Sequence, residues 1–159
     1  MKNPEKFAYA GGMDPIVRVA MTALMMAVIT LSGAVAGFAQ QETAFRTRLS
    51  PVPITVAMQS SVAGTGSVTA TLQGNKLTVD GTFQGMKSAA TVAHLHRGQP
   101  GIPGPRIADL TVTKAAKGSL SGSVDLTPAQ ADDLRNGRVY VQIHSESAPE
   151  GNLRGWLTP

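Results

Sequence analysis

Short segments with alternating apolar and polar side chains dominate the chain after residue 51, and they restrict the fold more than any other feature. Glycine, proline and asparagine separate these segments at spacings of roughly 8–12 residues, which is typical of Greek-key sandwiches and barrels. The sequence therefore predicts an all-β domain, a Greek-key β-sandwich or barrel of seven to eight strands. Its candidate strands are 52–58, 67–72, 76–83, 90–96, 107–113, 119–126, 139–145 and 153–157.

One short helix interrupts this pattern between the sixth and seventh candidate strands. Thr127 suits the N-cap, Pro128 the first helical position and Gly137 the position just past the end. We expect about two turns of helix here.

The residues before the first candidate strand divide into two parts. Residues 1–39 have a basic start, an apolar stretch at 19–35 and small residues up to Ala39, the layout of a secretory signal peptide. Residues 40–51 are mostly polar and are predicted to be a loose lead-in to a domain at 52–159.

Cleavage is predicted after Ala39, with Ala36 as the competing position and Met13 as an alternative start of the chain. An uncleaved anchor is the alternative, because a stretch of about 17 apolar residues reaches the lower limit for spanning a bilayer. The small residues at the cleavage position and the lack of a following basic cluster favour cleavage. We therefore expect a secreted or periplasmic protein with no membrane span after cleavage.

Composition excludes several kinds of site. The chain has no cysteine, which excludes disulfides, zinc–thiolate sites, cysteine nucleophiles and blue-copper centres. Its formal net charge is +4, but the basic residues are scattered and lack interleaved aromatics, so nucleic-acid binding is not expected. A bound metal would need histidine, carboxylate, methionine or backbone ligands.

The three histidines are the candidate metal ligands. His94 and His96 are two apart on one strand, so they share a face and lie roughly 6–7 Å apart. Val92 falls on the same face, which predicts that the histidines lie where the core gives way to the following Gly/Pro loop. His144 ends another alternating strand, and three imidazoles meet if the two strands are neighbours. The alternative is that the histidines only hydrogen-bond loop carbonyls.

Two C-terminal side chains have simpler interpretations. Arg154 is expected to be a strand-edge charge that pairs with Glu146 or Glu150. Trp156 is expected to plug the core or one end of the sandwich, with its indole N–H bonded to backbone.

Three motifs in order carry a family resemblance. The strings AHLHRGQPGIPGPRIADL, the Leu-Thr-Pro helix ending in LRNG, and VYVQIHSESAPEGNLRGWL together resemble the CHRD domain, over about residues 52–158. The resemblance implies a Greek-key β-sandwich of the kind found widely in exported bacterial proteins.

The order of the site motifs is also similar to that of the copper/zinc superoxide dismutases. That resemblance implies that His94, His96 and His144 are copper ligands and that Arg154 faces an anion. The resemblance does not extend to the zinc site of those enzymes. Arg106 follows Gly104-Pro105 where a metal-binding histidine would be expected, and cysteine is absent.

Two function hypotheses follow, from different classes. The first is an exported binding domain, not an enzyme, that holds one copper ion through three histidines with a further position open. The second is a metal-free structural or protein-interaction module that engages another extracytoplasmic protein. A superoxide dismutase-like enzyme is a third interpretation, implied by the resemblance alone.

Overall fold

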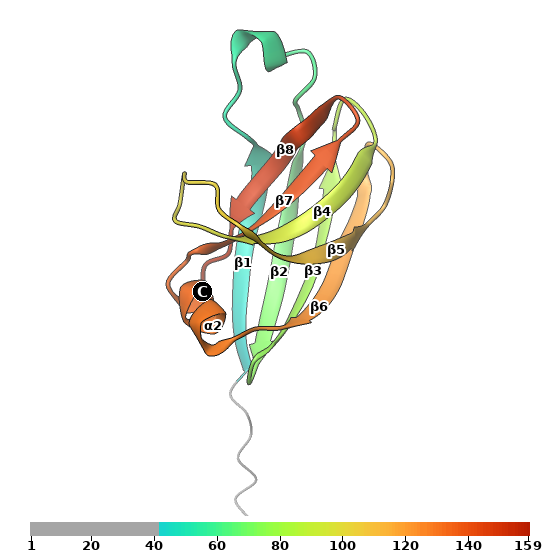
Figure 1. The fold of residues 1–159 in the computed structure, drawn as a ribbon. Helices are drawn as coiled ribbons and strands as arrows, with labels where there is room; N and C mark the ends of the chain where they lie inside the picture. The colour runs from blue at the N-terminus through green and yellow to red at the C-terminus, as the bar shows by residue number, and fades with distance from the viewer. Residues whose placement is uncertain (1–41) are drawn as a thin grey trace, which may run out of the picture. The chain divides into compact units, whose positions relative to one another are not determined.

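The computed structural model describes residues 42–159, which form eight β-strands, one short α-helix and one 3-10 turn (Figure 1). The signal segment predicted for residues 1–39 lies outside the described residues. Within the described part of the chain, no helix is long and apolar enough to cross a membrane. The elements are β1 (Glu42–Pro51), η1 (Val56–Met58), β2 (Thr65–Gln73), β3 (Lys76–Gln84), β4 (Ala90–Arg97), β5 (Arg106–Val112), β6 (Gly118–Asp125), α2 (Pro128–Arg135), β7 (Val139–Ser145) and β8 (Ala148–Trp156).

The strands form a closed antiparallel barrel in the order β1-β2-β3-β6-β5-β4-β7-β8. The predicted all-β fold with one short helix is confirmed. Because β3 pairs with β6, the chain between them crosses one end of the barrel and returns through β4 and β5. This crossover leaves β4 between β5 and β7, although β4 and β7 are far apart in the sequence.

The prediction of a loose lead-in at residues 40–51 is wrong, because most of that segment is strand β1. Phe45 and Leu49 point into the barrel and are fully buried, whereas their neighbours are partly or fully exposed. Phe45 pairs with Ala70 of β2, and Ser50 pairs with Arg154 of β8. The polar appearance of this segment reflects an outer face in solvent, while two large apolar side chains close the core.

The prediction of a strand at residues 52–58 is also wrong. This segment leaves the barrel as an irregular loop that contains η1. Pro51 and Pro53 lack the N–H groups that a continued ladder would need, and Ile54 and Val56 are 44% and 82% exposed. Val52 alone among the expected core residues stays buried, in a second small cluster with Val62 and Ala148.

The helix α2 forms as its end signals predict. Thr127 accepts a hydrogen bond from the Gln130 backbone N–H through its hydroxyl oxygen, and the Thr127 N–H donates back to the Gln130 side chain. This reciprocal pair satisfies two of the backbone groups that a helix start leaves free. Gly137, with a φ of 66°, ends the helix in a left-handed conformation that favours glycine.

The final hairpin is longer than predicted. The strand β8 begins at Ala148, whereas the sequence predicts a strand only from Leu153. The pairing between β7 and β8 shifts register between Ile143 and Ser145. This irregularity lies next to His144, at the end of the face that carries the candidate ligands.

One continuous hydrophobic core fills the interior of the barrel, and strands on all sides of the barrel contribute side chains to it. The histidine-bearing face of β4 is the outer one, because Ala93 and Leu95 point inward and are buried. The expectation that His94 and His96 lie at the edge of the core is therefore wrong. The largest fully buried apolar side chains are Phe45, Leu49, Leu77, Leu95, Leu120, Leu126, Leu134, Ile143, Leu153 and Leu157.

Candidate metal centre

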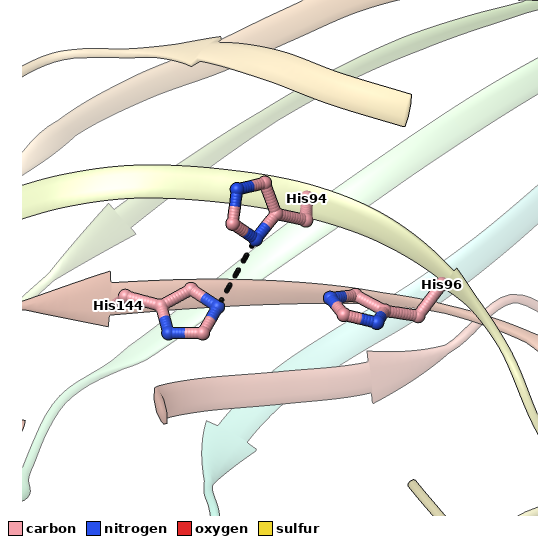
Figure 2. A group of neighbouring side chains, drawn as sticks. All are labelled: His94, His96 and His144. Atoms are coloured by element: carbon pink, nitrogen blue, oxygen red, sulfur yellow. Dashed lines mark hydrogen bonds between the residues drawn. The ribbon is translucent and has the colours of Figure 1, made fainter. Parts of the chain in front are cut away.

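The strands β4 and β7 bring the three histidines together on the outside of the barrel (Figure 2). His94 lies opposite Gln142 and His96 opposite Tyr140, so His144 lies diagonally beyond His94. One ring nitrogen from each histidine lies within 4.8 Å of one from each of the others. The predicted meeting of three imidazoles is confirmed, and all three rings are partly buried.

The nearest pair of ring nitrogens is His94 Nδ1 and His144 Nε2, which are 3.3 Å apart. The opposite nitrogen of each ring faces an acceptor. His144 Nδ1 lies 2.7 Å from the Pro149 carbonyl oxygen, and His94 Nε2 lies 3.4 Å from Asp109 Oδ1. The Pro149 carbonyl favours the His144 tautomer that carries its proton on Nδ1, so His144 Nε2 presents a lone pair toward His94 Nδ1.

His96 completes the arrangement in the same manner. Its Nδ1 lies 3.0 Å from the Gly104 carbonyl oxygen, which holds the proton there. Its Nε2 is buried and has no hydrogen-bond partner in the part of the chain that the structure describes, and Figure 2 shows the ring directed toward the other two histidines. A buried polar atom without a partner is rare in folded proteins and calls for a ligand, a water or an ion.

An amide side chain borders the cluster. Gln142 is 4% exposed, and its Oε1 accepts a 2.6 Å hydrogen bond from Arg154 Nε. Its Nε2 therefore faces the other way, donating to the Glu150 carbonyl oxygen at 3.0 Å and lying 3.3 Å from His144 Nε2. The donor end of the amide, not its oxygen, borders the three rings.

Arg154 does not form the ion pair that the sequence predicts. Its guanidinium lies 5.2 Å from the ring centroid of Tyr140 and 5.8 Å from that of Trp156, as a cation–π contact. Among residues 42–159, no carboxylate lies within ion-pair distance of it. The charge of Arg154 is therefore held beside the cluster without a counter-ion from this part of the chain.

Asp109 is the acidic residue in contact with the cluster. It lies opposite His94 in the pairing of β4 with β5. Its Oδ1 also accepts a hydrogen bond from Arg106 at 2.9 Å. Asp109 thus orients the His94 ring, while its negative charge is shared with an arginine.

The loop between β4 and β5 supplies the acceptor for His96. Gly104 donates its N–H to the Tyr140 hydroxyl oxygen at 3.1 Å, and the Trp156 indole N–H donates to the Gly98 carbonyl oxygen at 3.0 Å. The predicted bond from the Trp156 indole to backbone is confirmed, although the ring lies on the outer face beside Tyr140. These two bonds fix the loop over the edge of the candidate site.

Burial and nearby charges lower the pKa values of two imidazoles of the cluster, His94 and His96. The pKa of His94 lies below its ordinary value of 6.5, mainly because burial disfavours the charged form and also because of the His144 charge. Burial likewise lowers the pKa of His96, against the opposing effect of its hydrogen bond to Gly104. Neutral imidazole is the form that binds a metal ion.

The sequence identifies the three histidines but not the residues that orient them. Pro149 and Gly104 contribute only backbone carbonyls, which carry no signature in side-chain identity. For Gln142 the sequence gives a weak indication, because alternation along β7 places this residue on the same face as His144.

Comparison with known proteins places the chain in a family. No curated protein and no solved structure matches it. The model of the CHRD domain matches residues 45–157, which include most of β1, all of the other seven strands and all three histidines. The match starts within β1, in agreement with the finding that this strand is part of the domain. The chain therefore belongs to the CHRD domain family.

Proposed function

We propose that this domain is an exported binding protein that holds one copper ion through His94, His96 and His144. The observation that carries the proposal is the convergence of three ring nitrogens whose opposite nitrogens all face acceptors. With their protons on the nitrogens that face Pro149 and Gly104, His144 and His96 each offer a lone pair on Nε2. A metal ion would bind both lone pairs and so satisfy the buried His96 Nε2.

The spacing of the donors suits a transition metal. At a metal–nitrogen distance of about 2.0 Å, two ligands of one ion are roughly 3.3 Å apart at a tetrahedral angle and about 4 Å apart across a linear arrangement. The His94–His144 pair already has the tetrahedral spacing. The wider separations, up to 4.8 Å, require a contraction of up to about 1.5 Å to reach the same spacing.

The donor set supports copper among the candidate ions. Imidazole ligands suit copper, zinc, iron and nickel, and copper(II) has the highest affinity among the divalent ions. Carboxylate-rich sites for magnesium or calcium require oxygen ligands, which the trio does not supply. Three protein ligands leave a further position for water or another small ligand.

The test is a titration of the chelator-treated protein with Cu(II), and with Cu(I) under reducing conditions, against a competing chelator. We expect one ion per chain, with affinity lowered roughly 100-fold or more by His94→Gln, His96→Gln or His144→Gln, beyond what loss of a supporting partner costs. Val92→Gln is the matched control, because Val92 shares the outer face of β4 and offers no ring nitrogen. Absence of saturable binding, or equal binding by the histidine variants and the control, contradicts the proposal.

Arg154 is proposed to face an anion near the bound copper. The proposal is supported by a guanidinium that lacks a carboxylate partner among residues 42–159 and uses only its Nε toward Gln142. Azide added to the Cu(II)-loaded protein should alter its electron paramagnetic resonance spectrum, and less so in Arg154→Met. Superoxide consumption no faster than that of free copper would reject a dismutase-like role while leaving the binding proposal intact.

A protein-interaction module is the second candidate. It is favoured by the exposure of Ile54 and Val56 on the loop that leaves the barrel between β1 and β2 (Figure 1). If this function holds without metal, the double change Ile54→Ser and Val56→Ser abolishes partner binding, and the histidine variants retain it.

A further inference from the structure

The charges around the histidine cluster are unbalanced. Three neutral imidazoles bring no negative charge to an ion, and the one acidic contact, Asp109, shares its charge with Arg106. On the opposite side lies Arg154, which has no carboxylate within ion-pair distance among residues 42–159. Counting only the described residues, the surroundings of the three rings therefore carry about one net positive charge.

The positive charge of Arg154 is fixed in place. Its Nε donates to Gln142, and its guanidinium packs over Tyr140 and Trp156. An arginine side chain does not lose its proton in proteins, so this charge persists at any working pH. The contacts also restrict the guanidinium from moving away when a cation arrives.

Gln142 adds to the same effect. Because Arg154 takes the amide oxygen, the NH₂ end of Gln142 lies toward His144 Nε2 at 3.3 Å. The positive end of the amide dipole thus faces the site. An amide oriented the other way would have offered an oxygen ligand and a stabilising dipole.

From this arrangement we infer that the site selects copper as Cu(I) over divalent ions, and that Arg154 is the residue that determines the selectivity. The inference rests on the proposed copper site and specifies its oxidation state. A fixed positive charge repels a divalent ion twice as strongly as a monovalent one at the same position.

The twofold difference in Coulomb repulsion between divalent and monovalent ions makes a quantitative prediction. If neutralising Arg154 raises the Cu(I) affinity about tenfold, the Cu(II) and Zn(II) affinities should rise about a hundredfold, because the Coulomb energy scales with ion charge. The reduction potential of the bound copper should then fall by about 59 mV, the equivalent of one factor of ten for a one-electron couple.

The wild-type protein gives the first test. A bound Cu(II)/Cu(I) couple with a potential above that of free aqueous copper means that Cu(I) binds more tightly than Cu(II). We expect that result from voltammetry of the copper-loaded full-length chain. A potential below that of the free couple overturns the inference, even when the protein binds one copper ion per chain.

Variants at position 154 give the second test. Arg154→Met keeps much of the packing over Tyr140 and Trp156 but removes the charge, whereas Arg154→Lys keeps the charge. We expect the Met variant to show the unequal gains in affinity and the lower potential, and the Lys variant to stay near wild type. Arg135→Met is the control for net charge, because Arg135 is on the surface of α2 and pairs with Asp132.

The outcomes separate the two proposals. Equal changes in Cu(I), Cu(II) and Zn(II) affinity for Arg154→Met, or a Lys variant that behaves as the Met variant does, reject the role of Arg154 while copper binding stands. Failure of wild type to bind copper in either state rejects the proposed function itself. If Arg154→Met does not fold, the wild-type potential and the Lys variant still decide the question.

Discussion

The imidazole of His96 lies flat against the phenol ring of Tyr140, with ring centroids 4.9 Å apart and planes only 8° from parallel. The two residues are direct partners in the pairing of β4 with β7. Stacked rings on opposed strand positions restrict each other's rotation. The orientation of His96, and hence the direction of its free Nε2, depends on an aromatic side chain that need not contact the metal.

Replacing Tyr140 tests this dependence. We expect Tyr140→Leu to lower copper affinity roughly tenfold, in the range seen when a ligand loses its supporting partner. Tyr140→Phe keeps the stacked ring and loses only the hydroxyl that accepts from Gly104 N, so its effect should be smaller. Competitive copper titration measures both, and equal losses in the two variants would show that stacking has no role.

Gly104 has no room for a side chain. A Cβ at this position would overlap the Arg97 carbonyl oxygen, so Gly104→Ala must displace the loop and with it the carbonyl that binds His96. We expect weaker copper binding together with lower stability. Gly101→Ala is the control, because its Cβ would meet nothing within 4 Å although its φ is 87°. It should cost about 1 kcal/mol of stability and leave copper affinity unchanged.

Asp109 orients His94 without being required as a ligand. Asp109→Asn removes the negative charge that lies 3.4 Å from His94 Nε2, and copper affinity should fall about tenfold. Asp132→Asn is a matched control, since both aspartates have side chains that are 71% exposed and pair with an arginine three residues away. A similar loss of affinity in both variants would indicate a general charge effect instead.

The stability of the metal-free protein should depend on pH near neutrality. The pKa values of His94 and His96 are lowered in the folded state, so the unfolded chain takes up protons first as the pH falls through about 6.5. The free energy of unfolding should therefore decrease from pH 8 toward pH 5.5. The decrease ends once the pH is below the folded-state pKa values.

Urea unfolding of chelator-treated protein at several pH values measures this decrease. His96→Gln removes one of the two groups, so its stability should vary less steeply over the same range. A stability that rises on acidification would contradict the sign of the predicted linkage.

The core position of β1 can be tested by truncation of Phe45. Phe45→Ala should lower the free energy of unfolding by about 3–5 kcal/mol, the usual loss for a fully buried phenylalanine. Arg46→Ala, on the exposed face of the same strand, should change it by no more than about 0.5 kcal/mol. Equal thermal stability of the two variants would restore the interpretation of residues 40–51 as a loose lead-in.

Most of the fold could be predicted from alternation and turn residues, and the failures have a physical cause. Phe45 and Leu49 alternate with threonines at the other inward positions of β1, so the strand does not look apolar. The segment 52–58 alternates well but has no partner strand, and alternation alone does not report pairing. Local patterns predicted elements reliably where a hairpin joined them, as for β2 and β3 across Gly74.

The site could be predicted only in part for a related reason. Strand periodicity is local, so it places His94 and His96 on one face and predicts their separation. The adjacency of β4 and β7 results from the crossover of the barrel, and the tautomers depend on carbonyls of Pro149 and Gly104. Such relationships between distant segments become visible only once the chain is folded.

The closure of the barrel also determines when the histidine cluster acquires all of its surrounding groups. The ring closes when β1 pairs with β8, the first and last strands of the described chain. The strand β8 also supplies the Pro149 carbonyl that orients His144, and Arg154 beside the cluster. A chain that emerges N-terminus first presents His94 and His96 long before these groups arrive. The copper site that we propose is therefore complete only once β8 has paired with β1 and β7.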